Sequence, residues 1–463
     1  MGEYAPVTTD WREPLLAGAS VLDVRLARRD PARWPDYHPQ PSVRAYRLAG
    51  SPDAPGPVAV VWDFAVRGGS FGEDDATVLV AAVRHAIRER VPVLTLVRTG
   101  GTRLQEGVAG LVGIPRSRLA LLSLAEAGLP HLSVADAPTT GGVWISVVAA
   151  ADVRVAVAGA VVGFAGPRVV EAYTGALPGP DSHTAESAYA AGLVDAVLPP
   201  EQVVGWLRAT LATLAPSTAG ALAAPVVRVP SVVGGWEQVL RCRARTEGGR
   251  ELLTKLLTDR VPLRARGGDP SVAACVGRLS GRPVVGVAVA AELSGRPTPD
   301  GFRLAARAYR LAGRWGLPAL TLVDTPGAEP GPAAERDGIA PAIGAALDAL
   351  LTCPSPTLTL VHGEGGSGGA LAVAVADMVL MTDEAYFAAI GPEGAQAALR
   401  MSREDCADRM RIVPADLLSL GFADALVTPA DLAAQLATLV SVPDDVRRDL
   451  RLSRWSGTIP GTL

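Results

Sequence analysis

Lysine is almost missing from this 463-residue sequence: Lys255 is the only one, although Lys and Arg together number 43. A reaction that needs a catalytic lysine, or a cofactor attached to lysine, therefore has one candidate position. Lys255 lies between Glu251 and Leu257 in a segment with an ordinary helical pattern. The net charge of −4 gives no basic surface for nucleic acid and no attraction to an anionic membrane, so we expect neither partner.

Cysteine is also scarce, with four residues that form no C-x-x-C pair. This spacing excludes a ribbon-type zinc site and gives no disulfide framework, so we expect no metal and a cytoplasmic location. The four positions are Cys242, Cys275, Cys353 and Cys406.

Signals for secretion, membrane insertion and several enzyme classes are missing as well. The N-terminus has no basic region followed by an apolar one, and we expect no segment of membrane-spanning length. The sequence has no P-loop and no H-x-x-x-H pattern among its five histidines. What remains is a chain that is 49% hydrophobic and 19% charged, which predicts two or three ordered domains.

The two halves of the sequence repeat each other. Pro92 with its following strand pattern returns at Pro318, and Ala151-Asp152 returns as Ala376-Asp377. Gly142 is aligned with Gly369 at an offset of 227, and Gly166-Pro167 with Gly391-Pro392 at 225. Matches in one order with offsets of 225 to 227 indicate a domain duplication.

Each half alternates helices and short strands, which predicts α/β layers with parallel strands. Helices are expected at 77–89 and 301–315, and strands at 131–135, 357–361, 153–157 and 378–381. The predicted domains cover residues 55–215 and 270–440, with an N-terminal extension at 1–54 and a tail at 441–463. Residues 216–269 are expected to form the linker and the start of the second half.

A Gly-Gly pair in each half opens an apolar helix directly after a strand: Gly141-Gly142 and Gly368-Gly369. The first N–H groups of such a helix lack partners within the helix, and the helix dipole favours negative charge there. The pairs are therefore candidates for stabilising an oxyanion through the backbone alone. The alternative is that the glycines serve only close packing of helix and strand, but their recurrence in both halves favours the first interpretation.

Several motifs resemble one enzyme family. Trp62 to Gly72, Thr99 to Glu106, Pro138 to Val143 and Gly163 to Arg168 resemble the β subunit of bacterial acetyl-CoA carboxylase carboxyltransferase. Pro299 to Arg303, Asp324 to Ala328, Gly363 to Leu371 and Gly391 to Gly394 resemble its α subunit. The resemblance covers residues from about 58 to 427.

This resemblance implies two crotonase-like domains, each a ββα superhelix, and transfer of CO2 from N-carboxybiotin to a short acyl-CoA. Gly141 and Gly142 would hold the acyl-CoA thioester oxygen, and Gly368 and Gly369 the biotin oxygen. Biotin would arrive on a biotin carboxyl carrier protein charged by a biotin carboxylase, and active sites shared between protomers imply a homodimer or homohexamer. The malonyl-type product would enter fatty acid or polyketide biosynthesis. Residues beside the glycine pairs are expected to bind substrate: Gly100, Gly101, Thr140, Gly166, Arg168, Gly366 and Gly391.

The sequence also departs from this family. It has no four-cysteine zinc ribbon before the β-like half and no biotin-accepting lysine between methionines. The segment around Thr102 and Leu104 resembles the malonate decarboxylase β subunit too, so decarboxylation of a malonyl thioester stays an alternative, as does a non-catalytic scaffold subunit of a carboxylase complex.

Overall fold

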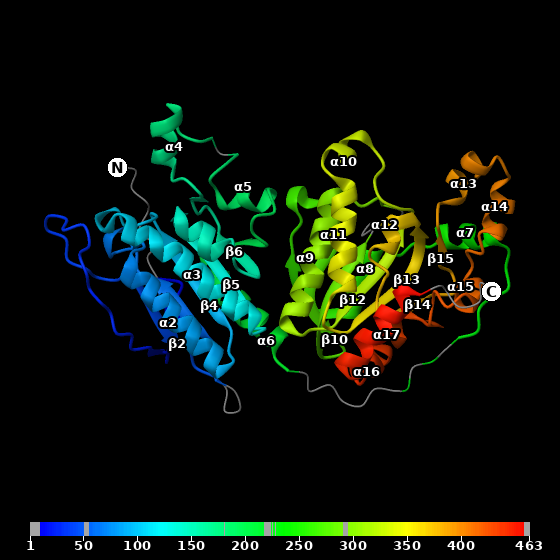
Figure 1. Cartoon of the computed structure of the whole chain (residues 1–463), viewed down its shortest axis with the longest axis horizontal. Coiled ribbons are helices and arrows are strands. Elements are labelled where there is room, and N and C mark those ends of the chain that lie inside the picture. The colour runs from blue at the N-terminus through cyan, green and yellow to red at the C-terminus, as the bar shows by residue number, and fades with distance from the viewer. Residues whose placement is uncertain are drawn as a thin grey trace. The chain divides into compact units, whose positions relative to one another are not determined.

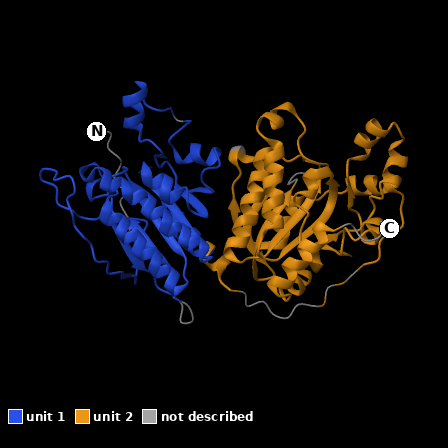
Figure 2. Ribbon diagram, in the orientation of Figure 1, with its two compact units in different colours: residues 1–209 blue, residues 210–463 orange. Residues whose placement is uncertain are grey.

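The computed structural model describes residues 10–50, 55–179, 181–216, 224, 226, 228–289 and 295–457. The chain forms two compact units, residues 1–209 and 210–463 (Figure 2). Each unit contains an eight-stranded sheet with helices packed on it (Figure 1). The predicted α/β class is therefore correct.

The strands of unit 1 are β1 (Ser20–Val21), β2 (Val43–Arg47), β3 (Val58–Trp62), β4 (Val93–Thr99), β5 (His131–Thr140), β6 (Val153–Val157), β7 (Val162–Gly163) and β8 (Ala196–Leu198). They follow the order β1-β2-β3-β4-β5-β6-β8, with β7 paired to β5. Pairing is antiparallel from β1 to β3 and parallel in the rest of the sheet. Since β2 lies in the predicted N-terminal extension, part of that segment belongs to the sheet.

The strands of unit 2 are β9 (Leu257–Leu263), β10 (Val272–Leu279), β11 (Arg282–Val289), β12 (Ala319–Thr325), β13 (Thr357–Gly366), β14 (Met378–Met381), β15 (Tyr386–Ala388) and β16 (Ala425–Leu426). The order β9-β10-β11-β12-β13-β14-β16, with β15 paired to β13, repeats the order of unit 1 strand for strand. The first two pairings are again antiparallel and the others parallel. The duplication that the sequence indicates is thus present in the fold.

The helices of unit 1 are α1 (Glu13–Leu16), α2 (Glu73–Glu89), α3 (Val108–Glu126), α4 (Pro167–Thr174) and α5 (Ala185–Ala190), and α6 (Pro200–Leu214) crosses the boundary. Short helical turns of this unit are η1 (Arg67–Gly69), η2 (Leu104–Glu106) and η3 (Trp144–Val148). Helices α2 and α3 lie side by side, and an added Cβ on Gly113 of α3 would lie 3.1 Å from the Ala76 Cβ of α2 (Figure 1).

The helices of unit 2 are α7 (Gly235–Arg243), α8 (Gly249–Leu256), α9 (Pro299–Trp315), α10 (Pro332–Arg336), α11 (Ile339–Leu351), α12 (Ser367–Leu371), α13 (Pro392–Leu399), α14 (Arg403–Arg409), α15 (Pro414–Ser419), α16 (Leu432–Val440) and α17 (Asp444–Ser456), with turns η4 (Arg266–Gly268) and η5 (Pro429–Asp431). Helices α9 and α11 take the places that α2 and α3 occupy in unit 1 (Figure 1). Leucines of β12, β13 and β14 form a core with α8 and α16 on the other face of the sheet.

The repeated Ala-Asp dipeptides have the same structural role in both units. The Asp152 carboxylate accepts the His131 N–H at 2.9 Å, and the Asp377 carboxylate accepts the Thr357 N–H at 2.7 Å. Each carboxylate therefore connects the first residue of one strand (β5 or β13) with the residue just before the neighbouring strand (β6 or β14). In unit 2, Asp377 also pairs with the buried guanidinium of Arg451 at 2.6 Å.

Candidate functional site

The predicted glycine pairs lie where a central strand turns sharply into a helix. Strand β5 ends at Thr140 and is followed by Gly141 with φ 74°, and β13 ends at Gly366 and is followed by Ser367 with φ 58°. A positive φ is rare for residues other than glycine, so the same unusual turn has formed twice. Both strands run further than predicted, through Pro138 and Glu364 respectively, to reach these turns.

The register of the repeat at these turns differs from the predicted one. Strands β5 and β13 have ten residues each and begin at His131 and Thr357, an offset of 226. Gly142 is therefore equivalent to Gly368 and not to Gly369, and the offset of 227 was wrong by one residue. The error arose because Ser367, and not a glycine, is the residue equivalent to Gly141 and has the same left-handed conformation. Aligning glycine with glycine therefore shifted the alignment by one residue.

A second loop approaches each turn from the neighbouring strand. After β4, the Thr99 Oγ1 accepts the Gly101 N–H at 3.0 Å, and after β12 the Thr325 Oγ1 accepts the Gly327 N–H at 3.1 Å. The φ angles of Gly101 and Gly327 are 119° and 126°. The two loops thus share one conformation, which the threonine hydroxyl holds in both units.

The loops meet the glycine turns backbone to backbone. An added Cβ on Gly141 would lie 2.9 Å from the Gly101 Cα, and one on Gly369 would lie 2.7 Å from the Ala328 N. Only residues without a side chain at these positions allow so close an approach. The contact brings the first turns of η3 and α12 next to the peptide groups of Thr102 and Ala328.

Each contact concentrates backbone donors in one place. The N–H groups of Thr102 and Ala328 have no hydrogen-bond partner among the described residues. The first N–H groups of the following helical turns lack partners within their own helix, but the N–H of Gly141, a predicted donor, is used by the Phe164 carbonyl at 3.0 Å. Backbone donors on two neighbouring loops are the kind of group from which an oxyanion hole for an enolate is built. Sequence reasoning missed Thr102 and Ala328, although both follow the repeated threonine and glycine at an offset of 226.

Packing explains most glycines of the run from 363 to 369. An added Cβ would overlap a neighbouring group at Gly363, Gly365 and Gly366 and would crowd the Ala328 backbone at Gly369. At Gly368 it would meet no atom of the described part of the chain within 4 Å. Packing therefore gives no reason for a glycine at 368, whereas a ligand that needs this space would.

A buried ionic cluster supports the loop after β4. The fully buried Arg103 pairs with Asp75 at 2.8 Å and with Glu106 at 3.3 Å, and the Tyr37 hydroxyl donates to Glu106 at 2.5 Å. Burial, together with the bond to Glu106, raises the pKa of Tyr37 to about 12. The Arg103 N–H also donates to the Phe71 carbonyl at 2.9 Å. Arg103 and Glu106, two side chains of the motif that resembles the β subunit, therefore hold the loop in place.

The two buried histidines lie away from the donor groups. His131 begins β5, at the opposite end of this strand from Gly141, and its Nε2 lies 3.0 Å from the Thr95 Oγ1. His362 lies in β13, and its Nδ1 is 3.0 Å from an Arg245 nitrogen. Burial and the Arg245 charge lower the pKa of His362 to about 3, which makes it a weak base. The geometry agrees with chemistry that depends on backbone donors and not on histidine.

The other predicted substrate-binding residues divide into two groups. Gly101 contacts Gly141, and an added Cβ on Gly166 would lie 3.7 Å from the Thr140 Oγ1, so these four residues come together. The Gly100 N–H is already used by the Gly68 carbonyl. Gly366 directly precedes α12 and lies against the backbone of Pro326. Arg168 is the second residue of α4, and Gly391 is the residue just before α13.

Helix α3 contradicts the expectation that no segment is long enough to span a membrane. It has 19 residues with a mean hydropathy of 1.4, so among the described residues it is long and apolar enough to cross a membrane. Its buried residues, which include Gly113 and Leu124, pack within unit 1, but only 28% of its apolar window is buried in the single chain. Among the described residues, no three His, Cys, Asp or Glu side chains are grouped to hold a metal ion.

Comparison with known proteins agrees with this architecture. Residues 238–438 match the family described as acetyl co-enzyme A carboxylase carboxyltransferase-like. The acetyl-coenzyme A carboxylase carboxyl transferase subunits beta/alpha of Salinispora arenicola are 39% identical over 401 residues, which cover 79% of this chain and 70% of the relative. The probable biotin-dependent acyl-coenzyme A carboxylase beta3 subunit of Mycobacterium tuberculosis is 33% identical and covers 86% of both chains.

Solved structures show the same fold. Transcarboxylase 12S, a hexamer crystallised with hydrolysed methylmalonyl-coenzyme A, has a TM-score of 0.73 and 25% identity over 86% of this chain and 81% of its own. A single-chain long-chain acyl-CoA carboxylase has a TM-score of 0.70 at 19% identity, covering 86% of this chain and 41% of that structure. Together with the duplicated sheets and the paired backbone donors, these relatives show that the chain belongs to the carboxyltransferases of biotin-dependent acyl-CoA carboxylases, with a crotonase-like fold in both halves.

Proposed function

We propose that this protein transfers CO2 from N-carboxybiotin, carried on a separate biotin carboxyl carrier protein, to acetyl-CoA or another short acyl-CoA. The observation that carries the proposal is the repeated pairing of a glycine turn with a loop that offers an unpaired N–H group, at Thr102 in unit 1 and at Ala328 in unit 2. One set of donors suits a thioester oxygen and the other suits the ureido oxygen of biotin. The acetyl-CoA carboxylase relatives and the methylmalonyl-coenzyme A of transcarboxylase 12S support an acyl-CoA substrate.

The residues of this chain would act by binding and by stabilising negative charge. Donors at Gly142 and Thr102 would hold the thioester oxygen as its enolate forms, which lowers the barrier to removal of the α-proton. Donors at Gly368 and Ala328 would hold the biotin oxygen, and the open space beside Gly368 fits a ring system. Bound carboxybiotin would supply the CO2 and a nitrogen that can accept the α-proton, so no side chain of this protein is needed as the base.

A biotin carboxylase and a carrier are the proposed partners. Lys255 is exposed and pairs with Glu247 at 2.6 Å and Glu251 at 2.7 Å, on the surface of α8. Nothing around it resembles a biotin-accepting site, so we expect no biotin on this chain. The purified protein should be inactive with acyl-CoA, ATP and bicarbonate until both partners are added. Streptavidin blotting that detected biotin on Lys255 would contradict this.

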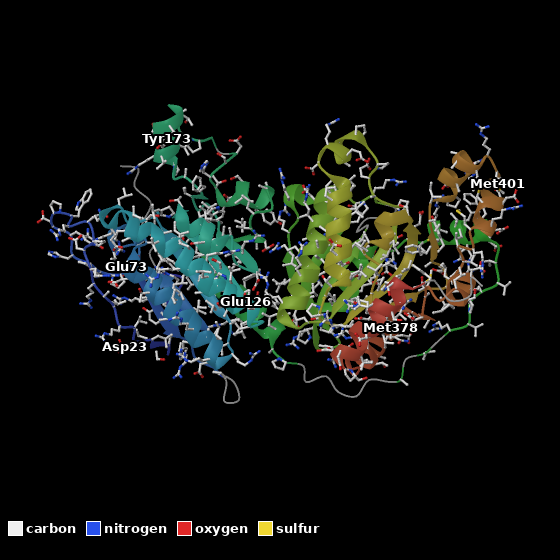
Figure 3. The ribbon with its side chains drawn as sticks, viewed as in Figure 1. Asp23, Glu73, Glu126, Tyr173, Met378 and Met401 are labelled. Atoms are coloured by element: carbon white, nitrogen blue, oxygen red, sulfur yellow. The ribbon has the colours of Figure 1, made fainter. Side chains whose placement is uncertain are left out.

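We also propose a homo-oligomer, a dimer or a hexamer, in which a second copy covers the outer face of α3. Exposed apolar side chains form a stripe along this helix and the turn before it: Leu104, Val108, Leu111, Val112, Leu119 and Leu122. A stripe of this kind on a soluble protein marks an interaction surface. Phe164, just before α4, and Tyr173, in α4, are exposed too, and Figure 3 labels Tyr173 on that helix. Light scattering of the Leu111→Glu variant should show a smaller species than the wild type.

Four free and buried cysteines support the proposed cytoplasmic location, and a malonyl-type product would serve fatty acid or polyketide biosynthesis. The reaction is tested with purified protein, malonyl-CoA and biocytin, measuring acetyl-CoA release from the reverse reaction. Release that depends on biocytin supports carboxyl transfer. Equal release without biocytin would indicate a malonyl-thioester decarboxylase, and no release with carboxylase partners present would indicate a scaffold.

A further inference from the structure

The two equivalent glycines, Gly142 and Gly368, have different surroundings. On the side of Gly142 where a Cβ would point, the Ile114 Cδ1 already occupies the space, and the Thr102 Oγ1 lies 3.5 Å from the same point. On the corresponding side of Gly368 no atom of the described residues lies within 4 Å. Since strand, turn and neighbouring loop follow the same course in the two units, this difference lies in side chains, and that of Ile114 stands closest to Gly142.

Ile114 is half-buried on α3 and directly precedes Pro115 inside this helix. An isoleucine in a helix has essentially one χ1 rotamer, which fixes its Cγ1, and the Ile114 Cγ1 lies only 2.8 Å from the point where a Gly142 Cβ would stand. It stands against Gly142, next to Thr102, and thus beside the two peptide groups whose donors we assign to the thioester oxygen. The acyl chain begins at the carbon that carries this oxygen, so Ile114 is within reach of its first carbons.

We propose that Ile114 is a specificity-determining residue that limits the length of the acyl chain. This inference rests on the proposed function and adds to it a residue and a substrate class, thioesters of the shortest acyl groups. A fixed branched side chain beside the oxyanion donors leaves room for a methyl group and obstructs a propyl chain. The unit 2 position has no such side chain, which agrees with a larger and rigid ligand there.

The test is a graded series at position 114. Ile114→Val deletes the Cδ1 atom that stands closest to Gly142, and Ile114→Ala removes most of the side chain. We expect the ratio of kcat/KM for butyryl-CoA to kcat/KM for acetyl-CoA to rise from wild type to Val to Ala. The rise for Ala should be about tenfold or more, since single methylenes in apolar pockets are discriminated by about 10–200-fold.

Ile87→Ala is the matched control. Ile87 is a half-buried isoleucine of the same unit, but it lies in the last turn of α2, at the amino ends of the parallel strands and away from Gly142. The control should keep the wild-type ratio. Activity is measured with the complete set of carrier and biotin carboxylase, and thermal melts show whether each variant is folded.

The outcomes separate this inference from the proposed function. A wild-type enzyme that carboxylates acetyl-CoA, with a ratio that changes less than twofold in folded Ile114→Val and Ile114→Ala, overturns the role of Ile114 alone. An equal change in Ile87→Ala overturns it as well. A wild type that carboxylates no acyl-CoA overturns the proposed function, and the inference with it.

Discussion

Gly368→Val is the most informative substitution for the second donor site. Position 368 lies in the first turn of α12, no atom of the described residues lies within 4 Å of an added Cβ, and its φ is not positive. A Cβ therefore meets no clash with these residues in the free protein. Glycine and valine differ in helix propensity by less than about 0.5 kcal/mol, so stability should change little. Gly369→Val is a poorer choice because its Cβ would crowd the Ala328 backbone.

The expected effect on catalysis is large. The branched side chain would fill the space that the biotin oxygen must enter to reach the Gly368 and Ala328 donors. Loss of one oxyanion donor typically costs about 10²–10³ in rate, or roughly 2.7–4 kcal/mol. In the reaction between malonyl-CoA and biocytin, turnover should fall by this factor, and the dependence on biocytin should change more than that on malonyl-CoA.

Gly344→Val is the control for this experiment. Gly344 lies within α11, and an added Cβ there also meets nothing within 4 Å. The control has the same change in composition and helix propensity, but it is not part of a glycine turn. Gly368→Val with wild-type turnover, at melting temperatures equal to that of Gly344→Val, would refute the assignment of donors to this turn.

Further predictions concern unit 1, the histidines and the buried charges. Gly142→Val should impair the use of acyl-CoA more than the use of biocytin. Because the added Cβ overlaps Ile114, this variant is compared with the double variant Gly142→Val, Ile114→Ala. Equal effects on both substrates would contradict the assignment of Gly142 to the thioester oxygen. His131→Ala and His362→Ala should lose less than the roughly 10²-fold or more that removal of a general base costs, and larger losses in folded protein would point to histidine catalysis. The pKa of His362 is lowered from 6.5 to about 3 on folding, so below about pH 6.5 the unfolded chain binds a proton that the folded one does not. The free energy of unfolding should therefore decrease as the pH is lowered from about 6.5 to 3, by up to about 1.4 kcal/mol per pH unit. Between pH 7 and pH 5, the urea midpoint of the His362→Gln variant should decrease less than that of the wild type. Arg103→Met leaves the carboxylates of Asp75 and Glu106 buried without their cation and should cost about 3–5 kcal/mol in urea unfolding, whereas a loss below about 1 kcal/mol would contradict a structural role.

The sequence predicted the layered fold and the duplication because both are written in local patterns. Helix α2 begins four residues before the predicted start, and β6 and β14 have the predicted bounds. Repeated dipeptides such as Ala151-Asp152 were visible because the same capping contact is needed twice. The first fifty residues gave no such signal, since β1 and β2 have only two and five residues.

The site could be predicted only in part. Glycine pairs are conspicuous, but Thr102 and Ala328 contribute peptide groups, and a peptide group leaves no trace in the residue type. Ile114 was not predicted because its contact with Gly142 joins two segments that only the fold brings together. The register error at Ser367 has a similar cause, since the sequence does not show that a serine has taken a left-handed conformation.

Ser367 has a consequence for how rigid the two donor sites are. Glycine loses more backbone entropy on folding than any other residue, and the turn of unit 1 combines Gly141 with Gly142 and the neighbouring Gly101. In unit 2, a serine with φ 58° replaces the first of these glycines, and its Oγ lies 3.0 Å from the point where a Gly327 Cβ would stand. A side chain in this conformation costs roughly 1–2 kcal/mol. It also narrows the range of backbone angles that the turn can sample, so the donors of unit 2 are held more stiffly than those of unit 1.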